Sequence, residues 1–324
     1  MTSPAEAIDY SVLVRSVTYE ADGVISMRLE GNGEPLPVWD PGAHIDVLLD
    51  DAGARHYSLC GDVSDRAAYR IAVLLEDDGR GGSKLLHTSV RAGDWLRIRP
   101  PRNHFVLEEA SGYVFIAGGI GITPLLPMIA EVHNRGVPWQ LHFAGRSRAA
   151  MPFLAELHRY GASVHTYPGD EGRRLDVQGV LEGAASDSLI YVCGPSRLSD
   201  AVSRAAGAAG AARVRRELFA VPEMEDGTDG TDGAAVTGFT VHLKKSGLDL
   251  EVPEDKSVLD VMLEAGVDVL HDCRDGICGS CETPVLEGEV DHRDYVLTNQ
   301  ERLESSCMMV CVSRAACSRL VLGA

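Results

Sequence analysis

The sequence is short of basic residues and lacks the apolar segments that would mark export or membrane insertion. It carries 30 lysines and arginines against 48 aspartates and glutamates, a formal net charge of −18 over 324 residues. This balance argues against nucleic acid or an anionic membrane as a partner, because both repel an acidic surface. Residues 1–9 lack the basic and apolar segments of a secretory signal, so we expect a cytoplasmic protein.

One uncharged stretch, residues 112–130, is nearly as long as a membrane span. Its middle contains Gly118, Gly119 and Gly121 followed by two prolines, which break a helix. A buried strand, a tight loop and a helix start fit this pattern better than one apolar helix. We therefore expect no membrane association.

Cysteine placement is the strongest signal in the chain. Cys273, Cys278 and Cys281 follow the C-x4-C-x2-C spacing, which with a distant fourth cysteine is typical of plant-type 2Fe-2S clusters. Cys311, with 29 residues between it and Cys281, is the predicted fourth ligand, and Cys307 is its rival. A zinc site would need a second C-x2-C pair or histidines at a suitable spacing, and disulfides are unexpected without a secretory signal.

The first hundred residues are predicted to form short strands separated by turns. The strands are expected at Val12–Thr18, Val24–Leu29, His44–Leu49, Arg55–Leu59, Tyr69–Leu75 and Trp95–Ile98. Short strands at this spacing favour an antiparallel β-barrel. Within this region Gly81, Gly82 and Ser83 lead into a short helix, an arrangement that favours anion binding.

The pattern changes after residue 107 to strands that alternate with helices, which predicts a parallel sheet. Strands are expected at Tyr113–Ala117, Trp139–Ala144, Ser163–Tyr167 and Leu189–Cys193. The glycine loop after the first of them is not a G-x-G-x-x-G fingerprint. It does follow the carboxyl end of a strand, where open α/β sheets bind ligands.

The last part of the chain is predicted to be a separate domain. Residues 221–236 contain acidic residues, a Thr-Asp-Gly repeat and no basic residue, which is typical of a linker. After it, Phe239–Leu243 and Leu248–Val252 are predicted strands and Ser257–Ala265 a predicted helix. Residues 237–324 carry 8 basic and 16 acidic side chains, a surface suited to a basic partner.

Five motifs occur in the order found in phthalate dioxygenase reductase and its relatives, and the chain resembles that family over nearly its whole length. They are Arg55 to Leu59, Gly81 to Ser83, Ala117 to Pro124, Cys193-Gly194-Pro195 and the C-terminal cysteine loop. The resemblance implies an antiparallel β-barrel FMN domain (1–107), a parallel-sheet α/β NAD domain (108–220), the linker (221–236) and a β-grasp ferredoxin domain (237–324).

By this resemblance, the Arg55-His56-Tyr57-Ser58 segment binds the flavin. Arg55 is expected to pair with the flavin phosphate, Tyr57 to flank the isoalloxazine ring and Ser58 to bond its polar edge. Further contacts are expected from His56, Ala72, Val73, Gly81, Gly82 and Ser83. Relatives with the cluster domain last use FMN, although the barrel by itself leaves FAD open.

For the nucleotide, the resemblance implies contacts from both glycine loops. The expected residues are Gly118, Gly119, Gly121, Thr123, Arg146, Cys193, Gly194 and Pro195. Cys193 and Phe219 would lie near the hydride path and Arg146 near the adenosine ribose. From the residues alone, Cys193 and Phe219 could be core residues and Arg146 a solvated charge. NADH is usual in the family, while Ser147 and Arg148 leave NADPH open.

We therefore expect a reductase that passes electrons from NADH to FMN, then to the 2Fe-2S cluster, then to a separate terminal Rieske-type oxygenase with a basic docking patch. Flavin is needed because nicotinamide donates a hydride whereas the cluster accepts single electrons. Since the cofactors carry this chemistry, we expect no catalytic acid-base pair. The alternatives are a reductase for a haem-thiolate monooxygenase and a binding protein whose cofactors are redox sensors.

The cluster assignment predicts a separable defect. Replacing Cys278 with serine should abolish electron delivery to the partner and leave reduction of the flavin by NADH largely intact, because the two steps use different cofactors. The measurement is anaerobic flavin bleaching beside reduction of the partner. Loss of both activities together would contradict this modular scheme.

Overall fold

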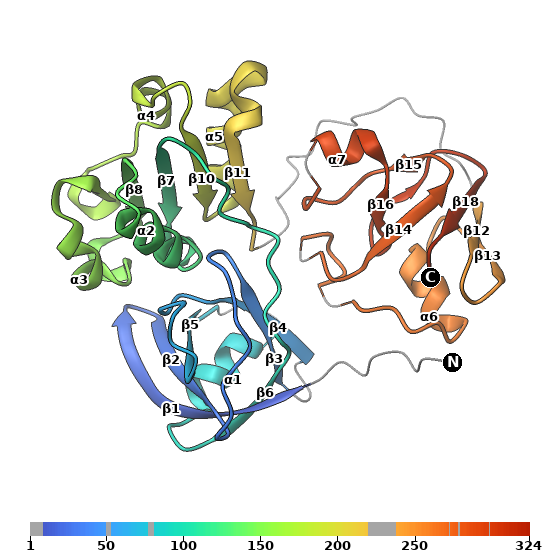
Figure 1. Ribbon diagram of the computed structural model, residues 1–324, viewed down its shortest axis with the longest axis horizontal. Helices are drawn as coiled ribbons and strands as arrows, with labels where there is room; N and C mark the ends of the chain where they lie inside the picture. Colours follow the sequence, from blue (N-terminus) through green and yellow to red (C-terminus); the bar gives the residue numbers. More distant parts are fainter. Residues whose placement is uncertain are drawn as a thin grey trace. The chain divides into compact units, whose positions relative to one another are not determined.

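The computed structural model describes residues 9–49, 53–76, 81–219, 238–271, 273–277, 279–297 and 299–324 (Figure 1). The chain divides into two compact units, with the boundary after Phe219. The predicted linker, residues 221–236, lies outside the described residues, as does Cys278. Within the described segments, every helix is too short or too polar to cross a lipid bilayer.

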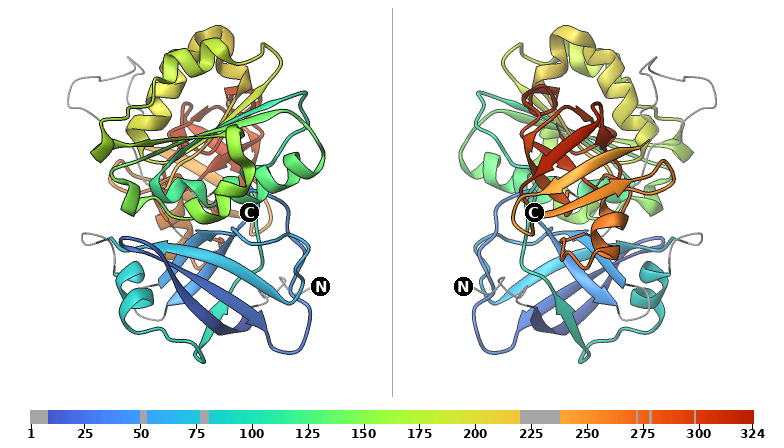
Figure 2. Two further views of the ribbon diagram at one scale, coloured as in Figure 1. Left: turned by 90° about the vertical axis from the view of Figure 1, so that its left-hand side faces the viewer. Right: turned by 90° about the vertical axis from the view of Figure 1, so that its right-hand side faces the viewer.

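The first unit begins with an antiparallel sheet whose strand order is β4-β3-β6-β1-β2-β5. Its strands are β1 (Tyr10–Ala21), β2 (Val24–Gly31), β3 (His44–Leu49), β4 (Gly53–Ser58), β5 (Ala68–Leu74) and β6 (Trp95–Ile98). A bridge between Leu59 and Ile71 joins the two ends of this order, so the sheet closes on itself. Figure 2 shows its strong curvature, and the expected barrel is confirmed.

The barrel core follows the two-residue period of its strands. Val12 and Val14 on β1, and Ile45 and Val47 on β3, are fully buried among the other core residues. Their neighbours in sequence point to the opposite face, because successive side chains alternate across a strand. The helix α1 (Gly82–Thr88) covers part of this core with Leu86, and it starts two residues before Lys84, where the sequence predicts a helix over Lys84–Val90.

The second sheet of this unit is parallel throughout, with strand order β11-β10-β7-β8-β9. Its strands are β7 (Tyr113–Gly118), β8 (Trp139–Gly145), β9 (Val164–Pro168), β10 (Leu189–Cys193) and β11 (Val214–Glu217). The connecting helices are α2 (Leu125–Asn134), α3 (Leu154–Leu157), α4 (Val177–Gly183) and α5 (Ser196–Gly210). Short 3-10 turns are η2 (Gly119–Ile122), η3 (Arg148–Ala150), η4 (His158–Ser163), η5 (Gly169–Glu171) and η6 (Ala211–Arg213).

Helices cover both faces of the parallel sheet. Phe115 packs in one core with Ile129 of α2, whereas Ile116 packs in another with Leu181 of α4 and Val202 of α5. This alternation is expected for a parallel strand that is buried on both faces. The parallel α/β prediction is confirmed.

The barrel and the parallel sheet share contacts within the first unit. Ala72 of the barrel belongs to the same buried cluster as Phe115. Arg70 of β5 pairs with Glu156 at 2.9 Å between Nη1 and Oε2, and its guanidinium lies 5.0 Å from the centre of the Phe153 ring. These contacts fix the two sheets against each other.

The second unit contains a mixed five-stranded sheet of order β13-β12-β18-β14-β16 and a two-stranded sheet. The strands are β12 (Phe239–Leu243), β13 (Leu248–Val252), β14 (Glu282–Glu287), β15 (Val290–Asp291), β16 (Cys307–Met309), β17 (Arg314–Ala315) and β18 (Arg319–Leu322). Two helices, α6 (Val258–Glu264) and α7 (Asn299–Glu304), accompany them. Ser257 and Asp260 form a capping box that starts α6. The predicted ferredoxin fold is confirmed.

Candidate functional site

At the flavin side of the first unit, Arg55 lies against the start of α1. A Cβ added to Gly82 would lie 2.7 Å from Cγ of Arg55, so this close approach requires glycine. Gly81 reaches the helix with φ of +84°. A guanidinium beside exposed helical N–H groups suits a phosphate. These residues therefore fit FMN.

Two other predicted flavin residues show how the pocket wall is built. The Ser83 hydroxyl accepts a hydrogen bond from the Glu76 N–H at 3.1 Å and keeps its proton for donation. Tyr57 packs against the barrel core, and burial raises the pKa of its phenol. Ala72 and Val73 are both buried in β5.

His56 and Ser58 point to the face of β4 opposite Tyr57, as strand alternation requires. His56 Nδ1 lies 2.9 Å from Oδ1 of Asp46, a buried carboxylate that also contacts Arg102 at 2.5 Å. Burial raises the pKa of Asp46, but the His56 hydrogen bond and the nearby cations outweigh it and lower the value to about 2. This ion-paired group holds β4 against β3.

His44 joins His56 and Asp46 in a cluster whose possible ligand atoms all lie within 4.8 Å of one another. Desolvation lowers the pKa of His44 to about 3, so its ring is neutral. Two arginines already neutralise Asp46, since Arg99 also lies 3.4 Å from it. A further cation at this cluster is therefore disfavoured.

At the carboxyl edge of the parallel sheet, glycines let two loops pack backbone against backbone. A Cβ on Gly121 would lie 2.3 Å from the Cys193 carbonyl oxygen, and one on Gly194 would lie 2.9 Å from Gly118 Cα. Gly118 also leaves room for Pro195. By contrast, Gly119 has φ of +54° and faces open space. The loop thus offers a bare backbone surface at the edge where a nucleotide is expected.

Thr123 is placed differently from the expected ligand contact. Its side chain is buried, and its hydroxyl donates to the Ile120 carbonyl oxygen at 2.9 Å. This bond closes the η2 turn. Contact between Thr123 and the nicotinamide stays a prediction.

The loop after β8 separates two arginines. Arg146 is exposed, while Arg148 makes two contacts with the Glu171 carboxylate, at 2.5 Å from Nε and 2.9 Å from Nη2. The Ser147 hydroxyl accepts from the Ala150 N–H at 3.3 Å. Because Glu171 compensates the Arg148 charge, the loop is better suited to NADH than to the 2'-phosphate of NADPH.

Glu217 is a site residue that motif analysis did not select. It lies at the end of β11, in register with Cys193, and the Cys193 thiol lies 3.8 Å from its Oε2. Desolvation raises the pKa of Glu217 to about 8, against the opposing effects of Cys193, His56 and Ser58. Phe219 follows two residues later and is 43% exposed, so it is not a core residue, and its stacking near the flavin stays a prediction. The signal for β11 was weak because its sequence, Val-Arg-Arg-Glu, is mostly charged.

In the second unit, three of the predicted cluster cysteines converge. Cys273, Cys281 and Cys311 are buried, and the Cys311 thiol contacts the other two. The Asp275 N–H donates to the Cys273 sulfur at 3.3 Å. Contact with Cys273 lowers the pKa of Cys311, whereas Cys281 and burial raise it, to about 12 overall. Packed thiols of this kind fit a cluster, because a bound cation deprotonates them.

Cys307, the rival ligand, lies elsewhere. It is in β16 and pairs with Pro284 of β14. Desolvation and Glu282 raise the pKa of its thiol to about 11. Cys311 is therefore the better fourth ligand, while Cys278 lies outside the described residues.

The cysteine loop keeps its shape with three residues at positive φ. They are Arg274 (61°), Gly276 (70°) and Gly279 (73°). Arg274 is strained there as a non-glycine residue, and its Nη1 contacts Asp260 of α6 at 3.1 Å. This ion pair anchors the loop to the helix.

Comparison with known proteins gives a consistent result. The family of 2Fe-2S iron-sulfur cluster binding domains matches residues 241–316. The phenoxybenzoate dioxygenase subunit beta of Ectopseudomonas oleovorans is 38% identical over 325 residues, 99% of each chain. The solved phthalate dioxygenase reductase is 34% identical with a TM-score of 0.69 over 100% of both chains.

A second solved structure places a similar chain in a larger protein. An intact type IV self-sufficient cytochrome P450 monooxygenase is 42% identical with a TM-score of 0.90. The match covers 100% of this chain and 43% of that one. This chain therefore spans less than half of the P450 protein.

The raised pKa of Glu217 predicts pH-dependent inhibition by NAD+. Below about pH 8 the carboxyl is neutral, and above it a carboxylate forms beside the proposed site of the cationic nicotinamide ring. Product inhibition by NAD+ should therefore strengthen several-fold between pH 7 and pH 9 by ordinary charge attraction. Glu217→Gln should remove this dependence.

The control for this experiment is Glu108→Gln, because Arg215 lowers the pKa of Glu108 and keeps it charged throughout that range. The measurement is the NAD+ inhibition constant with an artificial electron acceptor. If the NAD+ inhibition constant of the Glu217 variant still changed between pH 7 and pH 9, the titrating group would be another residue.

The Arg148–Glu171 pair predicts a change in cofactor preference. Glu171→Gln should release the guanidinium for a 2'-phosphate, so KM for NADPH should fall several-fold while KM for NADH stays the same. Glu131→Gln is the matched control, because it removes another exposed arginine partner, 2.7 Å from Arg135. An unchanged KM for NADPH in the Glu171 variant would argue against the idea that Glu171 keeps Arg148 from binding the 2'-phosphate.

Proposed function

The chain belongs to the phthalate dioxygenase reductase family, and from this premise we propose that it delivers electrons to a separate Rieske-type oxygenase. Its relatives include the phthalate dioxygenase reductase of Burkholderia cepacia, and the solved enzyme of that name is described as transferring electrons from pyridine nucleotides to a 2Fe-2S cluster. For this chain we take the electron donor to be NADH and the flavin to be FMN. The flavin, when bound, converts the electron pair of a hydride into single electrons for the cluster.

The observation that carries this proposal is that one chain contains residues suited to a flavin and a nucleotide in its first unit and residues suited to an iron-sulfur cluster in its second. In the first unit, Arg55 lies against Gly82 at the start of α1, where we propose the flavin phosphate, and Cys193 lies beside Glu217 at the edge of the parallel sheet. The second unit brings together buried thiols at the cysteine loop. A protein that only sensed redox state would need no nucleotide edge beside the flavin site.

The residues have distinct roles in the proposed function. Arg55 and the amides at the start of α1 would hold the FMN phosphate, and Tyr57 would flank the ring. Ser58, which lies opposite His44 in the β3–β4 pair, would bond the polar edge of the flavin. Cys193 and Phe219 would confine the nicotinamide, with Gly194 and Pro195 shaping the loop.

The metal ligands we propose are Cys273, Cys278, Cys281 and Cys311. A backbone N–H from Asp275 stabilises the first thiolate. The acidic composition of residues 237–324 supports docking on a basic patch of the oxygenase, because opposite charges steer association. The similarity to a P450 monooxygenase makes a haem-thiolate acceptor the second candidate.

The test uses the purified holoprotein with an NADH titration under anaerobic conditions. We expect released flavin to be FMN and both flavin and cluster absorbance to bleach. The reduced protein should then reduce a purified Rieske oxygenase component much faster than a purified P450, and high salt should slow the reaction. Faster reduction of the P450 would overturn the proposed acceptor, and bleaching of flavin alone would overturn the electron chain.

A further inference from the structure

Asp294 is a carboxylate buried inside the cluster-bearing unit, with a side chain that is 0% exposed. Its Oδ2 accepts hydrogen bonds from the N–H groups of Val296, at 3.1 Å, and Leu297, at 2.8 Å. A buried carboxylate is costly unless it is paired and hydrogen-bonded. The groups around it should therefore explain why it is there.

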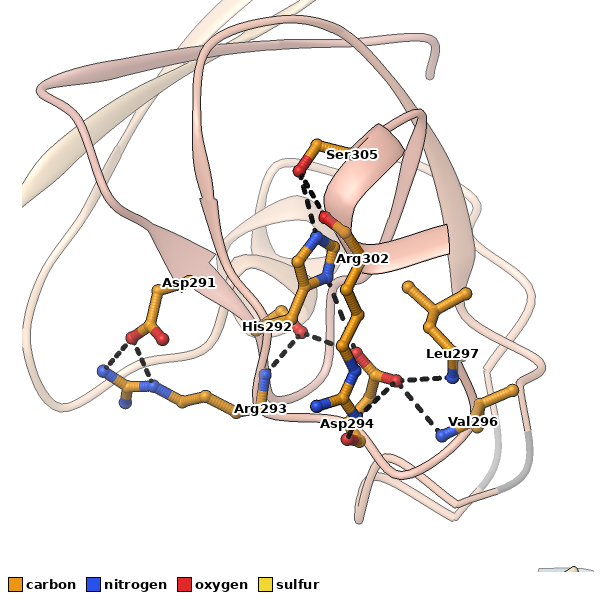
Figure 3. Close-up of polar contacts among 9 residues, drawn as sticks. Asp291, His292, Arg293, Asp294, Val296, Leu297, Arg302 and Ser305 are labelled. Atoms are coloured by element: carbon orange, nitrogen blue, oxygen red, sulfur yellow. Dashed lines mark hydrogen bonds and ion pairs between the residues drawn. The ribbon is translucent and has the colours of Figure 1, made fainter. Parts of the chain in front are cut away.

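Two side chains, Arg302 and His292, face the Asp294 carboxylate (Figure 3). Arg302 of α7 places Nη2 3.7 Å from Oδ2, and the same nitrogen donates to the Asp294 carbonyl oxygen. His292 places Nδ1 3.7 Å from Oδ1, and its Nε2 lies 3.3 Å from the Ser305 hydroxyl. Asp294 and Arg302 thus form a charge pair whose acid is fully buried and whose arginine is 29% exposed, and His292 lies against the acid.

This pair lies between the two segments that carry the proposed ligands. The Tyr295 N–H donates to the Gly276 carbonyl oxygen at 2.8 Å, and a Cβ on Gly276 would lie 3.1 Å from Asp294 Cα. Gly276 is in the middle of the cysteine loop. On the other side, the Ser313 hydroxyl donates to Asp294 Oδ1 at 3.4 Å, two residues after Cys311.

Stability alone does not account for such a pair. A buried ion pair can usually be replaced by apolar residues without loss of stability, because desolvation offsets the Coulomb attraction. A buried charge does act strongly on a nearby change of charge, since the interior screens it less than water does. The nearby change here is the single electron that the cluster gains.

We propose that Asp294 and Arg302 set the reduction potential of the cluster, with His292 as a positioning residue. The inference rests on the proposed function, since it requires the cluster at the cysteine loop. In the step concerned, the oxidised cluster gains one electron from the flavin and no proton. The carboxylate opposes the added negative charge and the guanidinium favours it. Removing the carboxylate should therefore raise the reduction potential of the cluster, and removing the guanidinium should lower it.

The experiment is a spectroelectrochemical titration of the full-length holoprotein. Asp294→Asn should shift the midpoint potential upward and Arg302→Gln should shift it downward. Each shift should be on the order of a tenfold change in the one-electron reduction constant, about 59 mV. Arg302→Lys keeps the positive charge, so its midpoint potential should stay close to that of the unmodified protein.

Asp291→Asn is the matched control from the same segment. Its side chain is 43% exposed and pairs with Arg293 at 2.7 Å, so solvent screens it and the potential should not move. Shifts of the same sign in both pair variants, or none, would refute the proposal. If Asp294→Asn lost its iron, the test would rest on position 302. There a lower midpoint potential in Arg302→Gln than in Arg302→Lys would support the proposal, and equal potentials would refute it.

The same titrations separate this inference from the function on which it rests. NADH bleaching of flavin and cluster in the unmodified protein tests the electron chain. Intact bleaching with unmoved potentials would overturn the role of the charge pair and leave the function standing. Failure of cluster reduction in the unmodified protein would instead overturn the function.

Discussion

Parallel register between β7, β10 and β11 is the constraint on which the nucleotide edge depends. Cys193 lies opposite Ala117 on one side and opposite Glu217 on the other. Since parallel strands end at the same edge, three segments far apart in sequence deliver their terminal residues to one place. The glycines then let the loops above this edge touch, so a side chain at Gly121 would separate them.

Charge is distributed differently around the two proposed cofactor sites. Arg148, after β8 of the parallel sheet, is paired with Glu171, whereas Asp46 in the barrel is paired with Arg99 and Arg102. We propose Arg55, beside the start of α1, for the flavin phosphate and the exposed Arg146 for the adenosine ribose. The cluster-bearing unit instead retains a charged pair in its interior, where one electron changes the local charge.

Much of the fold could be predicted from local patterns, while parts of the site could not. The helix capped by Ser257 is a local feature and appears where expected, and the local cysteine spacing selected three thiols that the fold brings together, Cys273, Cys281 and Cys311. β11 was missed because its charged sequence becomes a strand only by pairing with β10. Glu217 was missed because it reaches the site only through this strand pairing, and its raised pKa depends on neighbours that are distant in sequence. Asp294 could not be distinguished from the other acidic residues of the sequence, because its burial is visible only in the structure.

Two residues at the proposed hydride site, Cys193 and Glu217, are neutral near pH 7, and this has a functional consequence. Cys193 keeps its proton because desolvation raises the pKa of its thiol, and desolvation likewise raises the pKa of Glu217 to about 8. A nicotinamide ring that gives up hydride becomes a cation, which an ionised carboxylate would hold. A neutral carboxyl lets the product leave. Burial of an acid beside a thiol therefore favours turnover over product binding.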